Sequence, residues 1–280
     1  MGLDLAKALD CRGGWKIHIL GRNEARLAQA LEELPQARVH KADVGDYKDL
    51  GTAFQTVFRE EGRIDFVFAN AGVIERTNFY ANHVESNGDS PPPELDPTTL
   101  EVDLKGLTFT AYLALHYFRL SPHHGQGAHL VINSSCGGLY PAYYAPLYCA
   151  AKYGAVGFMR SIAQHFRVEG IQVNAICAGI VRTNLVDSES WNGFPANRFT
   201  PVEMVSAVIL LLLEGGESDG RGIVDGKGIR VPPSRLYGCA VEISDTQFYF
   251  RDQPEYCDEG MKEVMGATAL ENQIGAILST

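Results

Sequence analysis

The sequence predicts an α/β protein in three layers, with a parallel, doubly wound sheet between helices. Short apolar segments typical of strands alternate along the chain with longer segments of helical periodicity. A chain of 280 residues that is 45% hydrophobic can bury one large core. We therefore expect a single α/β domain over residues 1–232, followed by a C-terminal extension over residues 233–280.

The predicted elements follow one another in a regular order. Helices are expected at residues 3–10, 23–34, 46–61 and 98–120, around Tyr148, and at residues 201–214. Strands are expected at residues 16–20, 38–40, 64–68, 128–132 and 171–177, with a last strand near Ile223. This alternation implies right-handed crossovers between parallel strands. Residues 82–97, rich in Pro and polar residues, form a predicted surface loop.

Three polar side chains near the middle of the chain could share one proton. Ser135 follows the apolar run 128–132, so its hydroxyl should emerge at the carboxyl end of a strand, where open α/β sheets bind ligands. Tyr148 and Lys152 are four positions apart, which places them on one face of a helix. An ammonium beneath a phenol favours its ionised form and so lowers a pKa that is ordinarily about 10. The pattern predicts an acid–base site.

Motifs in a fixed order around this site resemble the short-chain dehydrogenase/reductase family. Its signature is a Ser thirteen positions before Tyr-x-x-x-Lys, and Ser135, Tyr148 and Lys152 have that spacing. The segment Phe68-Ala-Asn-Ala-Gly72 resembles the family's Asn-Ala-Gly turn, and Asp43-Val44 its pair beside the adenine. Residues 171–183 resemble its sixth strand and nicotinamide loop, with Ala178 in place of the usual Pro. The resemblance covers residues 2 to about 232.

The resemblance implies a Rossmann-like fold and an NAD(P)-dependent oxidoreductase that interconverts a ketone and a secondary alcohol. Tyr148 would be the general acid or base, Ser135 would polarise the substrate oxygen, and Lys152 would also bind the nicotinamide ribose. The residues that the resemblance assigns to the cofactor are Gly2, Asp43, Val44, Asn70, Ala71, Gly72, Tyr148, Lys152, Val181 and Thr183.

Arg22 favours NADP(H) over NAD(H). The acidic residue that binds a ribose 2′-hydroxyl is expected about 20 residues beyond the glycine-rich turn, at the end of the second strand. The sequence there is Leu20-Gly-Arg-Asn23, with a guanidinium that suits a 2′-phosphate. Asn23 would then cap the following helix.

Two departures from the family pattern bear on function. The first strand and most of the glycine-rich turn have no counterpart, and Gly2 aligns with the last Gly of that turn. Either about a dozen residues precede this sequence, which we favour, or the cofactor is not held in the family's way. Asp103 stands where the family usually has an Asn in a proton relay. Its carboxylate either adjoins Lys152 and alters the relay or lies on the helix surface.

Composition limits the partners. The formal net charge of −10, without a basic stripe, argues against nucleic acid or an anionic membrane. The six cysteines lack zinc or redox spacing, so we expect free thiols, no bound metal and a cytoplasmic protein. The densest apolar run, 208–213, is too short to span a bilayer, and the N-terminus does not resemble a signal peptide.

The substrate is expected to be a small, bulky, apolar carbonyl compound. Five aromatic side chains lie near the expected mouth of the site, or else pack in the core: Tyr140, Tyr143, Tyr144, Trp191 and Phe194. The tail after residue 232 packs on the body or on a second subunit of a homo-oligomer, or covers the substrate. Two other functions remain open: a redox-inactive isomerase or cyclase, and a catalytically silent scaffold subunit.

Overall fold

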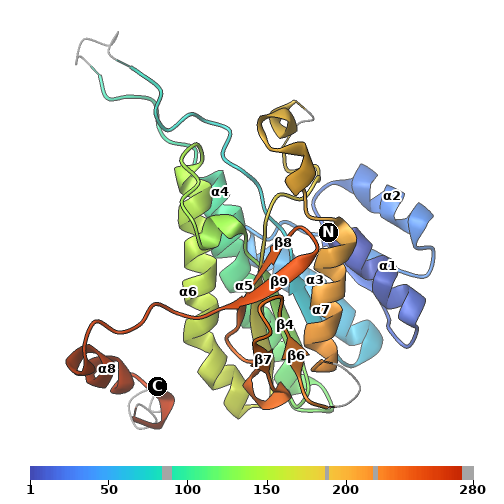
Figure 1. Cartoon of the computed structure of the whole chain (residues 1–280). Helices are drawn as coiled ribbons and strands as arrows, with labels where there is room; N and C mark the ends of the chain where they lie inside the picture. The colour runs from blue at the N-terminus through green and yellow to red at the C-terminus, as the bar shows by residue number, and fades with distance from the viewer. Residues whose placement is uncertain (84–89, 187–188, 217–219, 273–280) are drawn as a thin grey trace.

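The computed structural model describes residues 1–83, 90–186, 189–216 and 220–272. Its main sheet has five strands in the order β3 (Phe66–Ala69), β4 (His129–Asn133), β5 (Gln172–Ala178), β8 (Ala240–Ser244) and β9 (Gln247–Arg251). The first four are parallel, and β9 pairs antiparallel with β8 at the edge (Figure 1). Central β5 is buried almost throughout, as a parallel strand covered on both faces should be.

Two further strands form a separate parallel pair. β1 (His18–Gly21) pairs with β2 (Arg38–Lys41), and neither pairs with the main sheet among the described residues. A cavity of about 230 Å³ lies between the two sheets, lined by His18 and Leu20 of β1 and by the whole of β3. In the strand order that the family resemblance predicts, one further strand would lie at this position.

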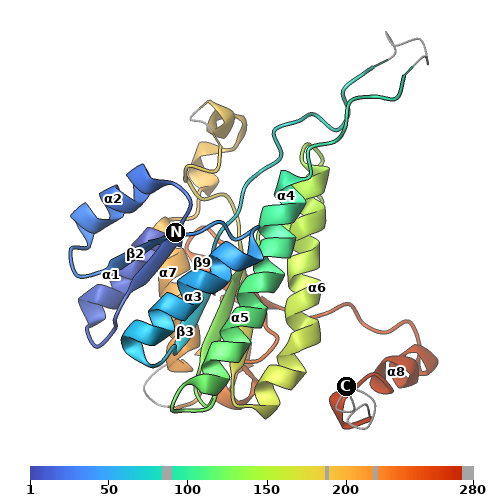
Figure 2. The same cartoon turned by 180° about the vertical axis from the view of Figure 1, so that it is seen from behind.

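Helices cover both faces of the sheets, which confirms the three-layer architecture. On one face lie α3 (Tyr47–Glu61), α5 (Leu107–Leu120) and α6 (Pro146–Val168), prominent in Figure 2. On the other face α1 (Gly2–Arg12) packs against α7 (Val202–Glu214). Each face has its own apolar core, with Phe118 fully buried in the first and Ile209 in the second. The remaining long helix of this half, α2 (Glu24–Glu33), packs on β1 and β2.

The helix predicted at residues 98–120 is broken in its hydrogen-bond pattern. It begins as α4 (Thr98–Leu100), continues as a π-helical turn, η2 (Glu101–Gly106), and becomes α5 only at Leu107. A π turn closes its hydrogen bonds one residue later than an α turn and is often found at functional sites. Asp103 lies in this turn.

The last strand of the parallel sheet is not the one predicted near Ile223. β6 (Ile223–Val224) pairs antiparallel with β7 (Arg230–Val231) in a small hairpin, whereas β8 pairs with β5. The short apolar run around Ile223 is too brief to form a ladder across β5. Two strands of the expected extension, β8 and β9, therefore belong to the main sheet, and only the chain beyond them, with α8 (Glu259–Gly266), leaves the body.

Shorter 3₁₀ turns connect several elements: η3 (Cys136–Gly138), η4 (Ser190–Gly193), η5 (Ala196–Arg198) and η6 (Pro233–Arg235). The segment Ala196–Glu214 is long and apolar enough to cross a membrane, with a mean hydropathy of 1.4. Its helix, α7, buries Val205, Val208 and Ile209 in the core, as a core helix of the same composition would. All six cysteines are free thiols.

Candidate active site

The loop after β4 places Ser135 beside helix α6. The Ser135 hydroxyl accepts a hydrogen bond from the Gly137 N–H at 3.1 Å, which starts the turn η3. This turn lies against α6 because Gly138 has no side chain: a Cβ there would lie 2.7 Å from the Lys152 carbonyl oxygen. The turn and the helix are therefore held at backbone contact.

The side chains of Ser135 and Tyr148 lie beside Gly137 and are joined by a hydrogen bond. A Cβ on Gly137 would lie 3.4 Å from Tyr148 Cε1 and 3.5 Å from Ser135 Oγ. Burial raises the pKa of Tyr148, a hydrogen bond with Ser135 lowers it, and the carboxylate of Asp103 raises it. The phenol is thus held in its protonated form, contrary to the expectation that Lys152 would lower its pKa.

Lys152 does not act as a free cation next to the phenol because Asp103 pairs with it. The Lys152 Nζ is 3.0 Å from Asp103 Oδ2, and the two side chains are 3% and 0% exposed. The same Nζ donates to the Asn133 carbonyl oxygen at 3.0 Å and lies 5.4 Å from the centre of the Tyr148 ring. Burial raises the pKa of Asp103 while Lys152 lowers it. Asp103 is therefore not a surface residue of the helix.

The turn after β3 surrounds this ion pair. The Asp103 Oδ1 accepts the Val73 N–H at 2.7 Å, and a Cβ on Gly72 would lie 3.0 Å from Asp103 Oδ2. Asn70 accepts from the Asn133 side chain at 3.1 Å, and a Cβ on Gly2 would lie 2.9 Å from Asn70 Nδ2. The first turn of α1 is thus packed against the ends of β3 and β4.

The residues predicted to contact the adenosine half of the cofactor lie at the ends of β1 and β2. Arg22 and Asp43 form an exposed ion pair, 3.7 Å apart, with side chains 52% and 41% exposed. Asn23 accepts from the Arg26 N–H and caps α2, as predicted. Val44 packs on Gly106, where a Cβ would lie 2.7 Å from Val44 Cγ2.

The loop after β5 carries the other predicted contacts. Val181 is buried with the core residues around α7, and Thr183 Oγ1 accepts the Leu185 N–H at 3.2 Å. Ala71 is exposed at the end of β3. All the predicted cofactor residues therefore follow, or adjoin, the carboxyl ends of the strands β1 to β5. These strands belong to two separate sheets.

The aromatic residues of the expected mouth divide into two groups. Tyr144 and Trp191 each contact Phe194, with ring centres 6.4 and 6.2 Å apart, and burial raises the pKa of Tyr144, which Tyr148 raises further. By contrast, Tyr143 is 82% exposed, and the Tyr140 hydroxyl donates to Glu242 at 3.2 Å. Only the first group forms an apolar wall near Tyr148.

Two site residues were missed in the sequence. The Asn133 carbonyl accepts a hydrogen bond from the Lys152 ammonium, and the Asn133 side chain donates one to the Asn70 side chain. Glu75 accepts the Tyr148 N–H at 2.7 Å and so caps the first turn of α6. The position of Asn133 at a strand end was a usable signal, whereas no spacing connects Glu75 with a helix 70 residues later.

A histidine pair outside this site brings together potential metal ligands. His18 Nδ1 and His40 Nε2 are 2.9 Å apart, and His18 Nε2 is 3.3 Å from Glu61. With Glu60, the two rings offer atoms within 4.8 Å of one another. These hydrogen bonds account for the arrangement without an ion, and the chemistry at Tyr148 does not involve it.

Comparisons with known proteins agree with this geometry. A family model described as short chain dehydrogenase matches residues 1–192. Short-chain dehydrogenase/reductase prx7 of Penicillium rubens is 58% identical over 281 aligned residues, covering 100% of both chains. The 15-hydroxyprostaglandin dehydrogenase [NAD(+)] of Homo sapiens is 31% identical, over 67% of this chain and 66% of its own.

Solved structures show the same fold. The crystal structure of levodione reductase matches with a TM-score of 0.65 and 24% identity, over 88% of this chain and 92% of its own. A short-chain type dehydrogenase/reductase from Mycobacterium marinum matches with a TM-score of 0.66 and 18% identity, over 88% and 89%. The fold, the ordered motifs and the family match lead to one conclusion: this protein is an oxidoreductase of the short-chain dehydrogenase/reductase family.

Proposed function

We propose that the protein interconverts a ketone and a secondary alcohol on a bulky apolar small molecule, with NADP(H) as cofactor and Tyr148 as general acid or base. The observation that carries this proposal is the hydrogen bond between the Ser135 and Tyr148 side chains beside Gly137, with the Lys152 ammonium 5.4 Å from the centre of the phenol ring. A hydroxyl pair of this kind can bind one carbonyl oxygen and give it a proton.

The residues at the strand ends fit a nicotinamide nucleotide. Asn133 Oδ1 is buried and has no hydrogen-bond partner in the described part of the chain, and Asn133 lines the same cavity as Asn70 and Asp103. The half-exposed Arg22 can pair with a 2′-phosphate, and the N-terminus of α1 beside Asn70 has no side-chain cap. Lys152, Val181 and Thr183 would hold the nicotinamide half. When bound, the nucleotide supplies or accepts the hydride.

The protonation state of Tyr148 favours carbonyl reduction. In this direction the Tyr148 hydroxyl donates its proton to the substrate oxygen while the Ser135 hydroxyl hydrogen-bonds the same oxygen. Burial, which raises the pKa of Tyr148, keeps the phenol in the protonated form near neutral pH. Alcohol oxidation needs the phenolate, so its rate should increase with pH.

The apolar wall of Tyr144, Trp191 and Phe194 supports a bulky apolar substrate. With three aromatic rings in this wall, dispersion and stacking contacts would bind such a compound better than a small polar one. We further propose that the protein is cytoplasmic and homo-oligomeric, and that neither nucleic acid nor membrane is its partner; the net charge of −10 supports the latter.

The substitution Tyr148→Phe tests the catalytic role. It removes the transferable proton and keeps the ring, so turnover of a ketone panel with NADPH should fall by at least about 100-fold. The circular dichroism spectrum and NADPH affinity should stay close to those of the parent. A variant that retained most of its reductase activity would remove Tyr148 from the acid–base role.

The substitution Arg22→Ala tests the cofactor preference. NADPH loses a charge-assisted contact and NADH does not, so the Kd for NADPH should rise about tenfold while that for NADH changes little. Nucleotide fluorescence measures both constants. Arg26→Ala, on the exposed side of α2, is the matched control. Equal weakening of both nucleotides would show that Arg22 does not bind the 2′-phosphate.

A redox-inactive isomerase or cyclase is the second candidate. The gap between β1 and β3 and the pairing of Lys152 with Asp103 both favour it, because each weakens a contact that the nucleotide would use. Conversion of a substrate without added nucleotide, and its loss in the Tyr148→Phe variant, would favour this function over the reductase.

A further inference from the structure

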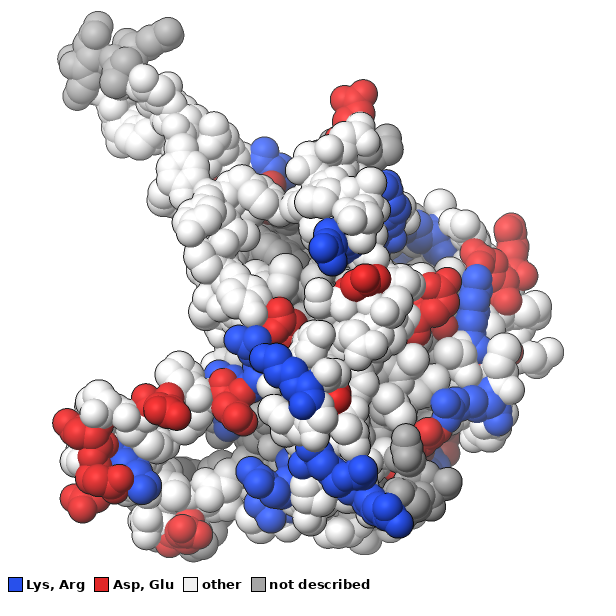
Figure 3. All heavy atoms as spheres, viewed as in Figure 1, with Lys and Arg blue, Asp and Glu red and all other residues white. Residues whose placement is uncertain are grey.

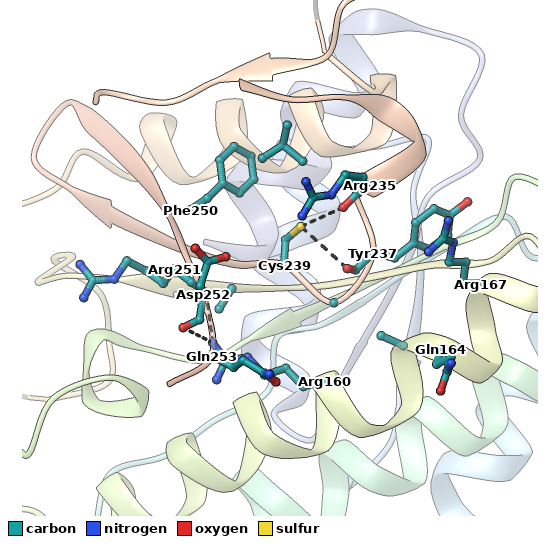
Figure 4. Close-up of a pocket in the computed structure, with 14 residues that line it drawn as sticks. Arg160, Gln164, Arg167, Arg235, Tyr237, Cys239, Phe250, Arg251, Asp252 and Gln253 are labelled. Atoms are coloured by element: carbon teal, nitrogen blue, oxygen red, sulfur yellow. Dashed lines mark hydrogen bonds between the residues drawn. The ribbon is translucent and has the colours of Figure 1, made fainter. Parts of the chain in front are cut away.

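A pocket of about 420 Å³ opens between helix α6 and the C-terminal part of the main sheet (Figure 4). This volume lies within the range of small-molecule sites, roughly 300 to 1,000 Å³. Arg160 is the first residue of α6 in the lining, and it comes roughly 18 Å after Tyr148 along the helix at 1.5 Å per residue. The pocket is therefore separate from the candidate active site.

Small residues that face each other leave this space open. Ala163 of α6 lies opposite Gly238, where a Cβ would lie 3.1 Å from the Ala163 side chain. Gly238 has a φ of 70°, which favours glycine, and its N–H donates to the Val173 carbonyl oxygen of β5 at 2.8 Å. Val231 and Phe250 complete an apolar lining. A larger side chain at either facing position would fill the pocket.

Four arginines line the same pocket, and three of them have no carboxylate partner in the described part of the chain. Arg251 pairs with Glu242 at 2.9 Å. The other three are Arg160, Arg167 and Arg235. Arg160 and Arg167 are two helical turns apart on α6, so both lie on the side of the helix that faces the pocket. Like charges gathered without counter-charges attract an anion.

The positive charge is local to this part of the surface. The chain as a whole has a formal net charge of −10, whereas the pocket has its four arginines against one acid, Asp252. Figure 3 shows Lys and Arg side chains gathered over the end of α6 and the β6–β7 hairpin. The acids of α8 leave the pocket arginines unpaired: Glu259 pairs instead with Lys262, at 3.1 Å. An anion from solution can therefore reach free guanidinium groups.

Two of the guanidinium groups have defined positions. Arg160 Nη2 donates to the carbonyl oxygens of Arg251 and Asp252, each at 3.1 Å. The Arg167 guanidinium lies over the Tyr237 ring, 5.4 Å from its centre, and donates no hydrogen bond to a described residue. A guanidinium presents five N–H donors, and two of them can bond both oxygens of a carboxylate or phosphate. The pocket thus offers donors that are already ordered.

We propose that this pocket binds an organic anion, with one carboxylate or phosphate group on an apolar body. The anionic group would bond Arg167 and Arg235, which are exposed and donate no other hydrogen bond in the described structure, and the body would lie on Ala163, Val231 and Phe250. An inorganic anion would leave the apolar lining uncovered, and a neutral compound would leave the guanidinium groups without a counter-charge. The inference does not depend on the proposed catalytic function.

Calorimetric titration of the full chain with four probes tests this chemistry. The probes 4-phenylbutyrate and phenyl phosphate carry both an apolar body and an anionic group. In 4-phenylbutanamide the charge is absent, and inorganic phosphate is the anion alone. At least one organic anion should bind, with an affinity that falls as NaCl is added, because salt screens the charges. The amide and inorganic phosphate should bind at least about tenfold more weakly. The organic anion that binds more tightly shows which anionic group the pocket prefers.

Two paired substitutions show where the probe binds. Arg167→Gln/Arg235→Gln removes both charges, and the affinity for the organic anion should fall by at least about tenfold. Arg26→Gln/Arg59→Gln makes the same change on exposed positions of α2 and α3, and the affinity should stay that of the parent. Circular dichroism checks that both variants fold.

Two results would overturn the proposal. One is the absence of binding of either organic anion to the parent chain. The other is equal affinity of the parent and the Arg167→Gln/Arg235→Gln variant, which would place the probe elsewhere, as at the aromatic mouth of the candidate active site. Reductase activity does not enter these measurements, so their failure would leave the proposed catalytic function standing.

Discussion

Asp103 changes the electrostatics of the site at the scale of a single residue. An Asn at this position would leave the Lys152 ammonium uncompensated beneath the phenol. The carboxylate instead neutralises it at 3.0 Å, with both side chains buried. Burying such a pair costs desolvation free energy, and the carboxylate changes the electrostatic potential at the neighbouring titratable groups. The Asp103 carboxylate therefore adds to the burial that raises the pKa of Tyr148 and keeps its phenol protonated.

Replacement of this carboxylate should move the pH dependence of catalysis. In the Asp103→Asn variant the amide oxygen still accepts the Val73 N–H, while the negative charge that raises the pKa of Tyr148 is lost. The pKa of Tyr148 should fall, so the pH at which alcohol oxidation reaches half its maximum should fall by about one unit or more. Initial rates between pH 6 and 11 measure this, and an unchanged profile would show that Asp103 does not influence the phenol.

The sequence predicts which site residues lie together when they are close along the chain. It does not predict contacts between residues that are far apart along the chain. Ser135, Tyr148 and Lys152 could be placed together because a strand end and one helix face determine their positions. The predicted lowering of the Tyr148 pKa was wrong in direction, because burial raises this pKa and the Asp103 carboxylate, which approaches from a distant helix, raises it further. The roles proposed for these residues stay predictions until the variants are measured.

At the scale of single elements, the helices were easier to predict than the strands. Asn23 and Asp46 cap α2 and α3 as their positions before a helical pattern indicate. The π-helical turn could not be predicted, because helical periodicity does not distinguish it from an α turn; Asp103 and Gly106 are buried in it. The last strand was misplaced for a related reason: short apolar runs do not show which partner they pair with, and only the fold selects residues 240–244 over Ile223.

Strand β4 begins with a histidine that makes the sheet sensitive to acid. Burial lowers the pKa of His129 from 6.5 to about 4. The unfolded chain therefore takes up a proton below about pH 6.5 that the folded chain refuses until about pH 4, so stability is lost as the pH falls through this window. In His129→Gln this loss should be absent, and it amounts to roughly 2 to 3 kcal/mol between pH 7 and pH 4.5.

Urea unfolding of parent and variant at the two pH values measures the difference. The comparison of the two proteins is what matters, because carboxylates also titrate in this range. His116→Gln, on the exposed side of α5, controls for the loss of a histidine as such. If parent and His129→Gln lost the same stability on acidification, His129 would not be the group responsible.

At the scale of the whole molecule, the dominant feature is the divided sheet. The order of β3, β4, β5 and β8 and the position of the helices agree with the predicted doubly wound fold. The division could also be foreseen, because no apolar run that could fill the centre of the sheet was found. What could not be foreseen is that β1 and β2 keep their pairing and their place beside the gap.

A strand supplied to this gap should increase both the stability of the protein and its affinity for the nucleotide. Each buried backbone group left unpaired costs on the order of 1 to 3 kcal/mol, and β1 and β3 each present an unpaired edge. We expect that a form carrying a five- or six-residue apolar strand and a glycine-rich turn ahead of Met1 melts at a higher temperature and binds NADPH more tightly. Calorimetry and fluorescence titration of both forms provide the comparison. Equally tight binding by the chain as given would contradict this expectation.

The gap also determines where the folded protein can open. Among the described strands, the backbones of β1 and β2 form a ladder only with each other, so their amides are protected by this two-stranded ladder and by the packing of α1 and α2. β4 and β5 have a hydrogen-bonded neighbour on both sides. The amides of β1 and β2 can therefore become exposed to solvent by local opening. The amides of β4 and β5 become exposed only by global unfolding. The adenosine half of the proposed cofactor site thus lies on the part of the molecule that opens most readily, and the Ser135 and Tyr148 pair on the part that opens last.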